Sequence, residues 1–139
     1  MTAPPENPQP RIGRRAVGAV GRLARSFYFA FAGLWFLLRT QRNARIEMCI
    51  GAVACALGAW LRIGRVEWAV LVFTMALVLI LEGLNTAVEA AVDLASPQTH
   101  PLAKAAKDLA AGMVLIAAIA SVAVGLLILG PPLWHRVFH

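Results

Sequence analysis

Charged residues are scarce in this chain. Asp, Glu, Lys and Arg make up 14% of its 139 residues, whereas hydrophobic residues make up 60%. Soluble domains carry about 25% charged and about 45–50% apolar residues. With a mean hydropathy of +0.71, this composition excludes an ordinary soluble domain and predicts an integral membrane protein. The chain is too short for a second domain or a separate soluble catalytic module, so we expect any chemistry at or in the bilayer.

Several common functional signals are also absent. Cys49 and Cys55 lie in an apolar segment without a Cys-x-x-Cys spacing or a histidine at metal-ligand spacing, which favours a role in helix packing. There is no Gly-x4-Gly-Lys-Ser/Thr loop and no His-Arg-Asp or Asp-Phe-Gly motif, so a nucleotide site would be of neither common kind. The net charge of +6 owes much to eight arginines between Arg11 and Arg45. They flank apolar segments, which indicates anionic lipid head groups and not nucleic acid as their partner.

Three apolar segments predict three membrane-spanning helices, because about 20 helical residues cross a hydrocarbon core of about 30 Å. The segments run from Met48 to Leu61, from Trp68 to near Leu94, and from Leu109 to Leu129. With their flanks, the predicted spans cover approximately residues 44–62, 66–94 and 101–130. The third helix is expected to stop at Gly130-Pro131-Pro132, because proline lacks the backbone donor that a helix needs.

The N-terminal part is organised differently. Residues 1–15 are rich in proline and polar residues, which predicts a disordered tail. Residues 17–40 place apolar side chains between arginines, which favours an amphipathic helix in the head-group plane over a fourth span. The predicted fold class is all-α integral membrane, with three transmembrane helices plus an N-terminal amphipathic surface helix, in a single domain over residues 16–136.

Basic residues predict the orientation, because cytoplasmic loops carry an excess of lysine and arginine. With a cytoplasmic N-terminus, the eight arginines share one side with Lys104 and Lys107. Three arginines face the other side: Arg62, Arg65 and Arg136. Three tryptophans then fall at the outer interface, where indoles prefer to lie: Trp60, Trp68 and Trp134. We therefore expect a multi-pass protein of the cell (inner or cytoplasmic) membrane.

Four polar side chains occupy the end of the second predicted span: Glu82, Asn85, Glu89 and Asp93. On a helix turning about 100° per residue they share one narrow face. Counted from Trp68, Glu82 lies about 21 Å along the helix and Glu89 about 31 Å, so Glu82 should lie just below the head groups, whereas Glu89 and Asp93 should reach water. A carboxylate facing hydrocarbon costs several kcal/mol, so Glu82 needs a partner or a task.

A turn over residues 96–101 leads into the third span, which opens with a second polar face: His100, Lys104, Lys107, Asp108 and Ala111. Lysines beside the positive end of a helix dipole form an anion site, and the turn brings it close to Glu89 and Asp93. Mg²⁺ takes one or two carboxylates and fills its shell with phosphate oxygens and water. A carboxylate in a low-dielectric setting can act as a general base on an alcohol. Together these parts indicate phosphoryl transfer to a lipid hydroxyl.

Simpler interpretations stay open at this point. The carboxylates and Asn85 could form only inter-helix hydrogen bonds or ion pairs, the lysines could be ordinary positive-inside residues, and His100 could be a turn residue. The competing class is a non-enzymatic, small oligomeric membrane protein, such as a transporter subunit or an assembly factor. Such a protein would use the carboxylate face for packing or for ions.

Four motifs together resemble the small prokaryotic diacylglycerol kinase and undecaprenol kinase family: Ser26-Phe-x-x-Ala-x-x-Gly33, Asn43-x-Arg-Ile46, Glu82-x-x-Asn-x-x-x-Glu-x-x-x-Asp93 and His100-Pro-Leu-Ala-Lys-x-x-Lys-Asp108. The resemblance runs from about Arg22 to Leu129. It implies a homotrimer with active sites shared between neighbouring subunits. It also implies that ATP, with Mg²⁺, phosphorylates the primary hydroxyl of a membrane lipid, either undecaprenol or diacylglycerol.

The resemblance further implies roles for individual residues. Glu82 corresponds to the catalytic base that activates the bound lipid hydroxyl, and Glu89 to a ligand of the metal on ATP. The other positions follow the family motifs: Asn85 and Asp93 support the site, His100, Lys107 and Asp108 contact nucleotide, and Ala111 contacts the lipid substrate.

The sequence departs from the family pattern at Gln41, where the family has its second metal-ligating glutamate. Glutamine keeps an acceptor oxygen but loses the charge, which puts metal affinity or stoichiometry in doubt. Glu47, six residues later, is a different position. Arg22 corresponds to a basic contact to nucleotide or lipid, and Phe29 stands where some members have a tyrosine that contacts nucleotide.

Overall fold

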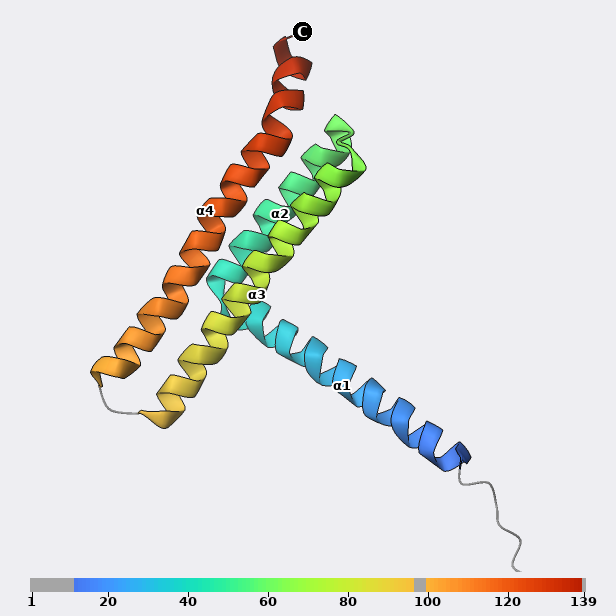
Figure 1. Cartoon of the computed structure of the whole chain (residues 1–139), viewed down its shortest axis with the longest axis vertical. Helices are drawn as coiled ribbons and strands as arrows, with labels where there is room; N and C mark the ends of the chain where they lie inside the picture. Colours follow the sequence, from blue (N-terminus) through green and yellow to red (C-terminus); the bar gives the residue numbers. More distant parts are fainter. Residues whose placement is uncertain (1–11, 97–99, 139) are drawn as a thin grey trace, which may run out of the picture. The chain divides into compact units, whose positions relative to one another are not determined.

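A computed structural model describes residues 12–96 and 100–138, with side chains from Val20 onward. These residues form four α-helices and no strand: α1 (Ile12–Thr40), α2 (Arg42–Leu61), α3 (Arg65–Ala95) and α4 (Pro101–Phe138) (Figure 1). The prediction of an all-α protein is therefore confirmed. The chain divides into two units between Phe36 and Leu37, within α1.

The first unit contains α1 up to Phe36. The helix begins at Ile12, inside the predicted tail of residues 1–15; the first eleven residues of that tail lie outside the described residues. The earlier start is understandable because Pro10 is the last proline before the helix. The aromatic side chains of this unit are exposed, and Arg25 lies over the ring of Phe29, 5.7 Å from its centroid.

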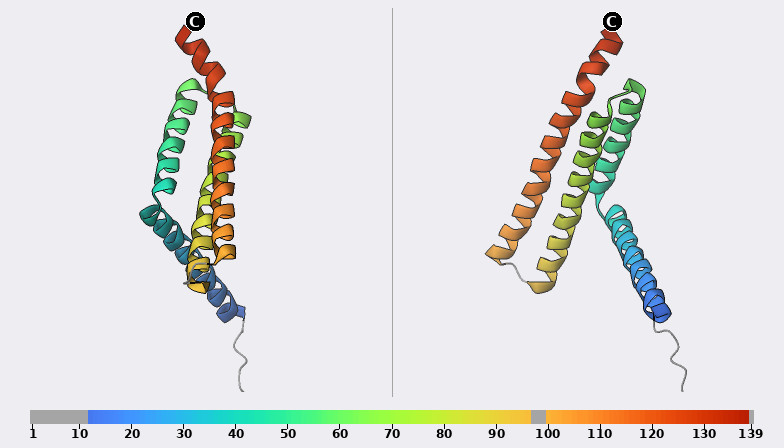
Figure 2. Two further views of the ribbon diagram at one scale, coloured as in Figure 1. Left: turned by 90° about the vertical axis from the view of Figure 1, so that its left-hand side faces the viewer. Right: turned by 45° about the vertical axis from the view of Figure 1, so that its right-hand side comes forward.

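The second unit is an up-and-down arrangement of α2, α3 and α4, which lie side by side in every view (Figure 2). In the described part of the chain these three helices, of 20, 31 and 38 residues, are long and apolar enough to cross a membrane, which confirms the number of spans. At about 1.5 Å per residue, α3 is about 46 Å long and α4 about 57 Å. Both exceed a hydrocarbon core of about 30 Å, so their ends reach the interfaces or beyond.

A tight connection joins α2 to α3 at residues 62–64. Arg62 adopts a left-handed conformation (φ 56°, ψ 46°), and the backbone N–H groups of Arg62 and Ile63 donate to carbonyls of the last turn of α2. These bonds satisfy carbonyls that a helix end otherwise leaves free. Glu67 caps the start of α3, because its carboxylate accepts the N–H of Gly64 at 2.5 Å. The connection therefore sets α2 and α3 antiparallel.

Small residues let α2 approach α3 closely. Ala44, Gly51 and Gly58 recur every seven residues, so they share one face of α2, and all three are buried. A Cβ atom on Gly51 would lie 2.6 Å from the Cε atom of Met75. An apolar cluster closes the bundle near the α2–α3 connection and contains Leu61, Ile63, Leu71 and Leu129.

The prediction that the last helix stops at Gly130 is wrong. Helix α4 continues through Pro131 and Pro132 to Phe138, and it changes direction in its C-terminal part (Figure 2). The two prolines remove only the hydrogen bonds to carbonyls one turn earlier, and such a loss bends a helix without always ending it. Contacts beyond the prolines hold the last turns in place, because Leu133 packs against the apolar cluster.

Candidate active site

The polar residues of α3 become progressively more exposed toward the end of the helix. Glu82 is 2% exposed, Asn85 and Glu89 are half-buried, and Asp93 is exposed. Their spacing of three, four and four residues keeps them on one face. The Nδ2 atom of Asn85 donates to the Oε1 atom of Glu89 at 3.2 Å. The polar face therefore descends from the turn between α3 and α4 into the bundle, as the sequence predicts.

Glu82 is the one buried polar or charged side chain among the residues whose side chains are described. Its Oε2 atom has no hydrogen-bond partner, and the same holds for the Oδ1 atom of Asn85 one turn away. Buried polar groups normally have partners, since leaving one unsatisfied costs about 1–3 kcal/mol. A carboxylate oxygen and an amide oxygen are thus both buried without a hydrogen-bond partner, one turn apart on the same face of α3.

Glu47 on α2 is a member of this site that the sequence reasoning missed. It lies near Glu82, and its Oε2 atom is also buried without a partner. A signal for it existed in the sequence. Glu47 lies three residues after Ala44 and four before Gly51, so it belongs to the small-residue face that packs on α3.

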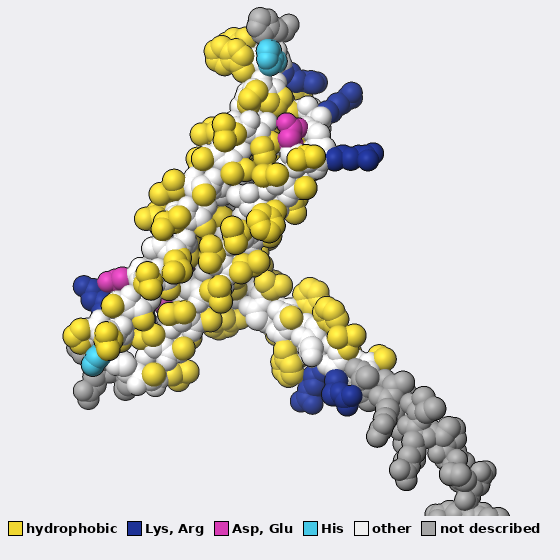
Figure 3. Space-filling view, in the orientation of Figure 1, with side chains coloured by type: hydrophobic (Ala, Val, Ile, Leu, Met, Phe, Trp, Pro, Cys, Tyr) yellow, Lys and Arg dark blue, Asp and Glu magenta, His cyan; other side chains and the backbone are white. Residues whose placement is uncertain are grey.

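An ion pair joins the outer part of this face to α4. The Nζ atom of Lys107 lies 2.6 Å from the Oδ1 atom of Asp93, and the two side chains are 36% and 66% exposed. The predicted closeness of the lysine face to the end of α3 is therefore observed for this pair. Figure 3 shows the acidic and basic side chains gathered at this end of the bundle, beside the connection between α3 and α4.

The other predicted residues of this region lie just before α4 or in its first three turns. The Nδ1 atom of His100 accepts the backbone N–H of Leu102 at 3.2 Å, so His100 caps the helix start. This bond gives the histidine a local structural role in addition to any ligand contact. Asp108 and Ala111 are both exposed. They follow Lys107 by one and four residues, so Ala111 shares its face and Asp108 lies beside it.

Gln41 stands at the N-cap position of α2 with an extended backbone (φ −94°, ψ 120°). Its backbone N–H donates to the carbonyl of Leu37 at 2.8 Å, and its half-buried side chain makes no capping hydrogen bond. Leu37 in turn borders Gly83, the neighbour of Glu82, where an added Cβ would lie 3.7 Å from Leu37 Cδ2. The start of α2 thus lies beside the Glu82 level of α3. Arg22 belongs to the first unit, where its carbonyl accepts the hydroxyl of Ser26.

The carboxylates do not form a cage for a metal. Among the described residues, no group of three or more His, Cys, Asp or Glu side chains is placed to hold an ion. Mg²⁺ does not need such a cage, because it binds through one or two carboxylates and completes its shell with phosphate oxygens and water. Glu89 fits this use, since it is half-buried and Asn85 engages its Oε1 atom, which orients the carboxylate.

The sequence of this chain is similar to those of known proteins. The sequence model of the prokaryotic diacylglycerol kinase family matches residues 28–129. A diacylglycerol kinase of Synechocystis sp. is 50% identical over 109 residues, which are 78% of this chain and 62% of that protein. An undecaprenol kinase of Bacillus subtilis is 39% identical over 114 residues, 82% of this chain and 93% of that protein. A diacylglycerol kinase of Escherichia coli is 31% identical over 101 residues, 73% of this chain and 83% of that protein.

These names define a class, the kinases that act on membrane lipids. The chain belongs to the prokaryotic diacylglycerol kinase family, which confirms the resemblance found in its motifs. It spans about three fifths of the length of the Synechocystis relative and nearly all of the Bacillus one.

Proposed function

We propose that this protein transfers the γ-phosphate of ATP to the primary hydroxyl of a membrane lipid alcohol, undecaprenol or diacylglycerol. One observation carries the proposal: Glu82 is buried with a partnerless carboxylate oxygen, and it lies on the same face of α3 as the exposed Asp93, which pairs with Lys107 of α4. A lipid hydroxyl reaches the level of Glu82 from the bilayer, whereas a nucleotide reaches the exposed end from water.

In the proposed reaction the lipid hydroxyl oxygen attacks the γ-phosphorus in line with the leaving oxygen. A new oxygen–phosphorus bond forms, and the bond to the oxygen that bridges the β- and γ-phosphates breaks. Glu82 accepts the hydroxyl proton, and ADP leaves with the bridging oxygen. Lys107 contributes positive charge to the phosphates of the nucleotide at the exposed end of the site.

Glu89 and Gln41 are the residues that would hold Mg²⁺. The ion, when bound, supplies positive charge to the phosphates of ATP. Asn85 holds Glu89 in position, and its hydrogen bond to the Oε1 atom supports that role. The nucleotide contacts that we propose are His100 just before α4, Lys107 and Asp108 on α4, and Arg22 on α1. The proposed lipid contact of α4 is Ala111.

We further propose a homotrimer whose sites are shared between neighbouring subunits, with α1 at the membrane surface and the N-terminus in the cytoplasm. The partnerless buried oxygens of Glu47, Glu82 and Asn85 support a shared site, because a neighbouring subunit and its substrates could satisfy them. The arrangement of basic residues supports the orientation. Crosslinking in native membranes measures the assembly, and a product no larger than a monomer would contradict a shared site.

The variant Glu82→Gln tests the proposed base. It keeps the side-chain shape but removes the carboxylate, so ADP release that depends on Mg²⁺ and added lipid alcohol should fall by about 10²–10⁴-fold. The matched control is Glu67→Gln, the same change on the same helix at the opposite end, where glutamine also suits a helix start. Near-normal turnover of the Glu82 variant, with assembly and helix content unchanged, would remove Glu82 from the role.

The acceptor is a separate question, because both lipids present a primary hydroxyl at a similar depth. The relatives include kinases named for each lipid. Measuring kcat/KM with purified protein and each alcohol in mixed micelles assigns the preferred substrate. If neither lipid alcohol is phosphorylated under conditions where ATP binds, the proposed reaction is contradicted.

A further inference from the structure

The end of the bundle opposite the candidate active site carries an unusual excess of positive charge. Its basic residues are Arg62, Arg65 and Arg136, and Glu67 is the one acidic residue of the described chain at this end. Glu67 is already engaged, because its carboxylate caps the backbone of Gly64. Figure 3 shows the basic side chains gathered on one side of this end. The three arginines therefore lack a matching set of acids within the bundle.

One of these arginines is held in a defined position. The guanidinium of Arg136 lies over the ring of Trp60, with 5.0 Å between its Cζ atom and the ring centroid. A guanidinium stacked on an aromatic face keeps the N–H groups along its edge free to bind oxygen atoms in its own plane. The contact also joins the last turns of α4 to the end of α2, beyond the bend at the two prolines.

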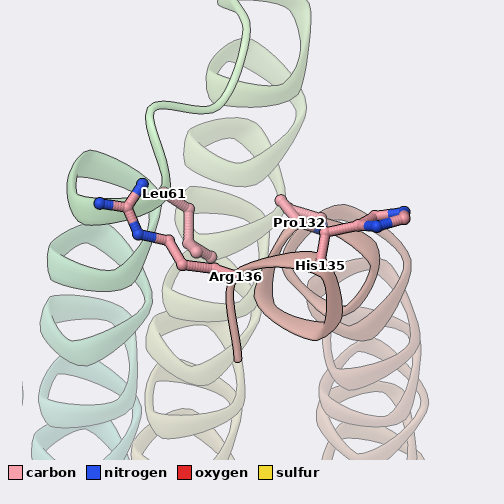
Figure 4. Close-up of a pocket in the computed structure, with 4 residues that line it drawn as sticks. All are labelled: Leu61, Pro132, His135 and Arg136. Atoms are coloured by element: carbon pink, nitrogen blue, oxygen red, sulfur yellow. The ribbon is translucent and has the colours of Figure 1, made fainter. Parts of the chain in front are cut away.

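An open pocket of about 590 Å³ lies beside this contact and is lined by Leu61, Pro132, His135 and Arg136. Figure 4 shows that Arg136 extends from α4 toward α2 alongside Leu61, whereas the ring of His135 points to the other side. The pocket thus combines a fixed positive charge with an apolar floor. We call Arg62, Arg65, Arg136 and Trp60 the distal rim.

We propose that the distal rim binds the phosphate head group of an anionic phospholipid in the leaflet at this end of the bundle. Charge complementarity requires an anion, and planar guanidinium groups match phosphate oxygens well. The apolar lining and the exposed rings of Trp60 and Trp134 belong to the level where head groups meet acyl chains. A phospholipid satisfies both conditions, since its phosphate meets Arg136 while its acyl chains lie along the exposed apolar surface of α4.

This site is separate from the kinase reaction. It lies at the α2–α3 connection and the C-terminal end of α4, whereas Glu82 and Lys107 lie toward the connection of α3 to α4. In the orientation proposed above, these three arginines lie on the non-cytoplasmic side, where membrane proteins normally carry fewer basic residues. An anionic head group bound there neutralises their charge.

Photo-crosslinking in lipid nanodiscs tests the proposal on the full chain. Nanodiscs contain traces of a photoreactive phosphatidylglycerol or of the matched photoreactive phosphatidylcholine, and crosslinked peptides are mapped by mass spectrometry. We expect phosphatidylglycerol to crosslink residues 60–66 and 132–138 several-fold more than phosphatidylcholine does. Equal crosslinking by the two lipids would overturn the proposal.

Variants separate a defined site from general attraction to the membrane. Arg136→Gln should lower the preference for phosphatidylglycerol at these peptides by roughly fivefold, the effect of one basic residue near an anionic surface. Arg136→Lys should retain part of it. The control Arg39→Gln, at the last turn of α1, should leave it unchanged. An unchanged preference for phosphatidylglycerol in Arg136→Gln would contradict the proposal. Displacement of the lipid by inorganic phosphate at matched ionic strength would also contradict it, because the site would then be assigned to a free anion.

Discussion

The ion pair of Lys107 and Asp93 allows a structural role and a catalytic role to be separated by reversing it. The perturbation is the double variant Asp93→Lys with Lys107→Asp, compared with each single change. The Nζ–Oδ1 distance is 2.6 Å, but the side chains are 36% and 66% exposed, so solvent screens the pair. Pairs of this kind contribute about 0.2–1 kcal/mol to the free energy of unfolding. Each single variant should therefore lose at most about 1 kcal/mol, and the reversed pair should recover most of it.

Turnover should respond differently from stability. If Lys107 supplies charge to the phosphates, its loss should lower kcat by about 10²–10³-fold, the size observed when a stabilising donor is removed from a reacting group. The reversed pair should not restore kcat, because position 107 then carries a negative charge. Thermal unfolding followed by circular dichroism measures stability in detergent, and ADP release measures turnover. A reversed pair that regained both stability and turnover would show that Lys107 acts only as the partner of Asp93, and the proposed role would fall.

Two further predictions concern packing and metal binding. Gly51→Leu should lower the free energy of unfolding by about 1–3 kcal/mol through overpacking against Met75. The control Gly125→Leu should change it little, because an added Cβ there meets nothing within 4 Å. Equal shifts of the melting temperature in the two variants would refute the close approach of α2 and α3. Gln41→Glu introduces a carboxylate at the start of α2, so the Mg²⁺ concentration for half-maximal turnover should fall by about tenfold. An unchanged Mg²⁺ titration would exclude Gln41 from the metal shell that we propose for Glu89.

Much of the fold could be predicted from the sequence because membrane spans have strong signals. The expected span over residues 66–94 corresponds to α3 at Arg65–Ala95, and that over 44–62 corresponds to α2 at Arg42–Leu61. The apolar runs and their polar flanks define these limits, since the hydrocarbon thickness fixes the length. The end of α4 could not be predicted in this way. Whether a helix continues through two prolines depends on contacts beyond them, here those of Leu133 and Arg136.

The part of the candidate site that lies on a single helix, α3, could be predicted from the sequence. Glu82, Asn85, Glu89 and Asp93 share a face because of helix geometry alone, and their order of exposure follows from depth. Glu47 could not be placed by the same reasoning. Its position near Glu82 depends on how two helices are rotated and aligned against each other, and the close approach of Met75 to Gly51 is one contact of that alignment.

That packing has a consequence for the spacing of residues along α2. Met75 packs against Gly51. A shift of α2 along α3 by one whole turn would therefore move Glu47 about 5.4 Å from its present position near Glu82. Inserting one residue between Glu47 and Gly51 would instead rotate Glu47 by about 100° around the helix axis, while Gly51 stayed packed against Met75. The number of residues between Glu47 and Gly51 therefore fixes where Glu47 lies. Inserting or deleting a residue there should damage the site more than substituting the side chains of residues 48–50.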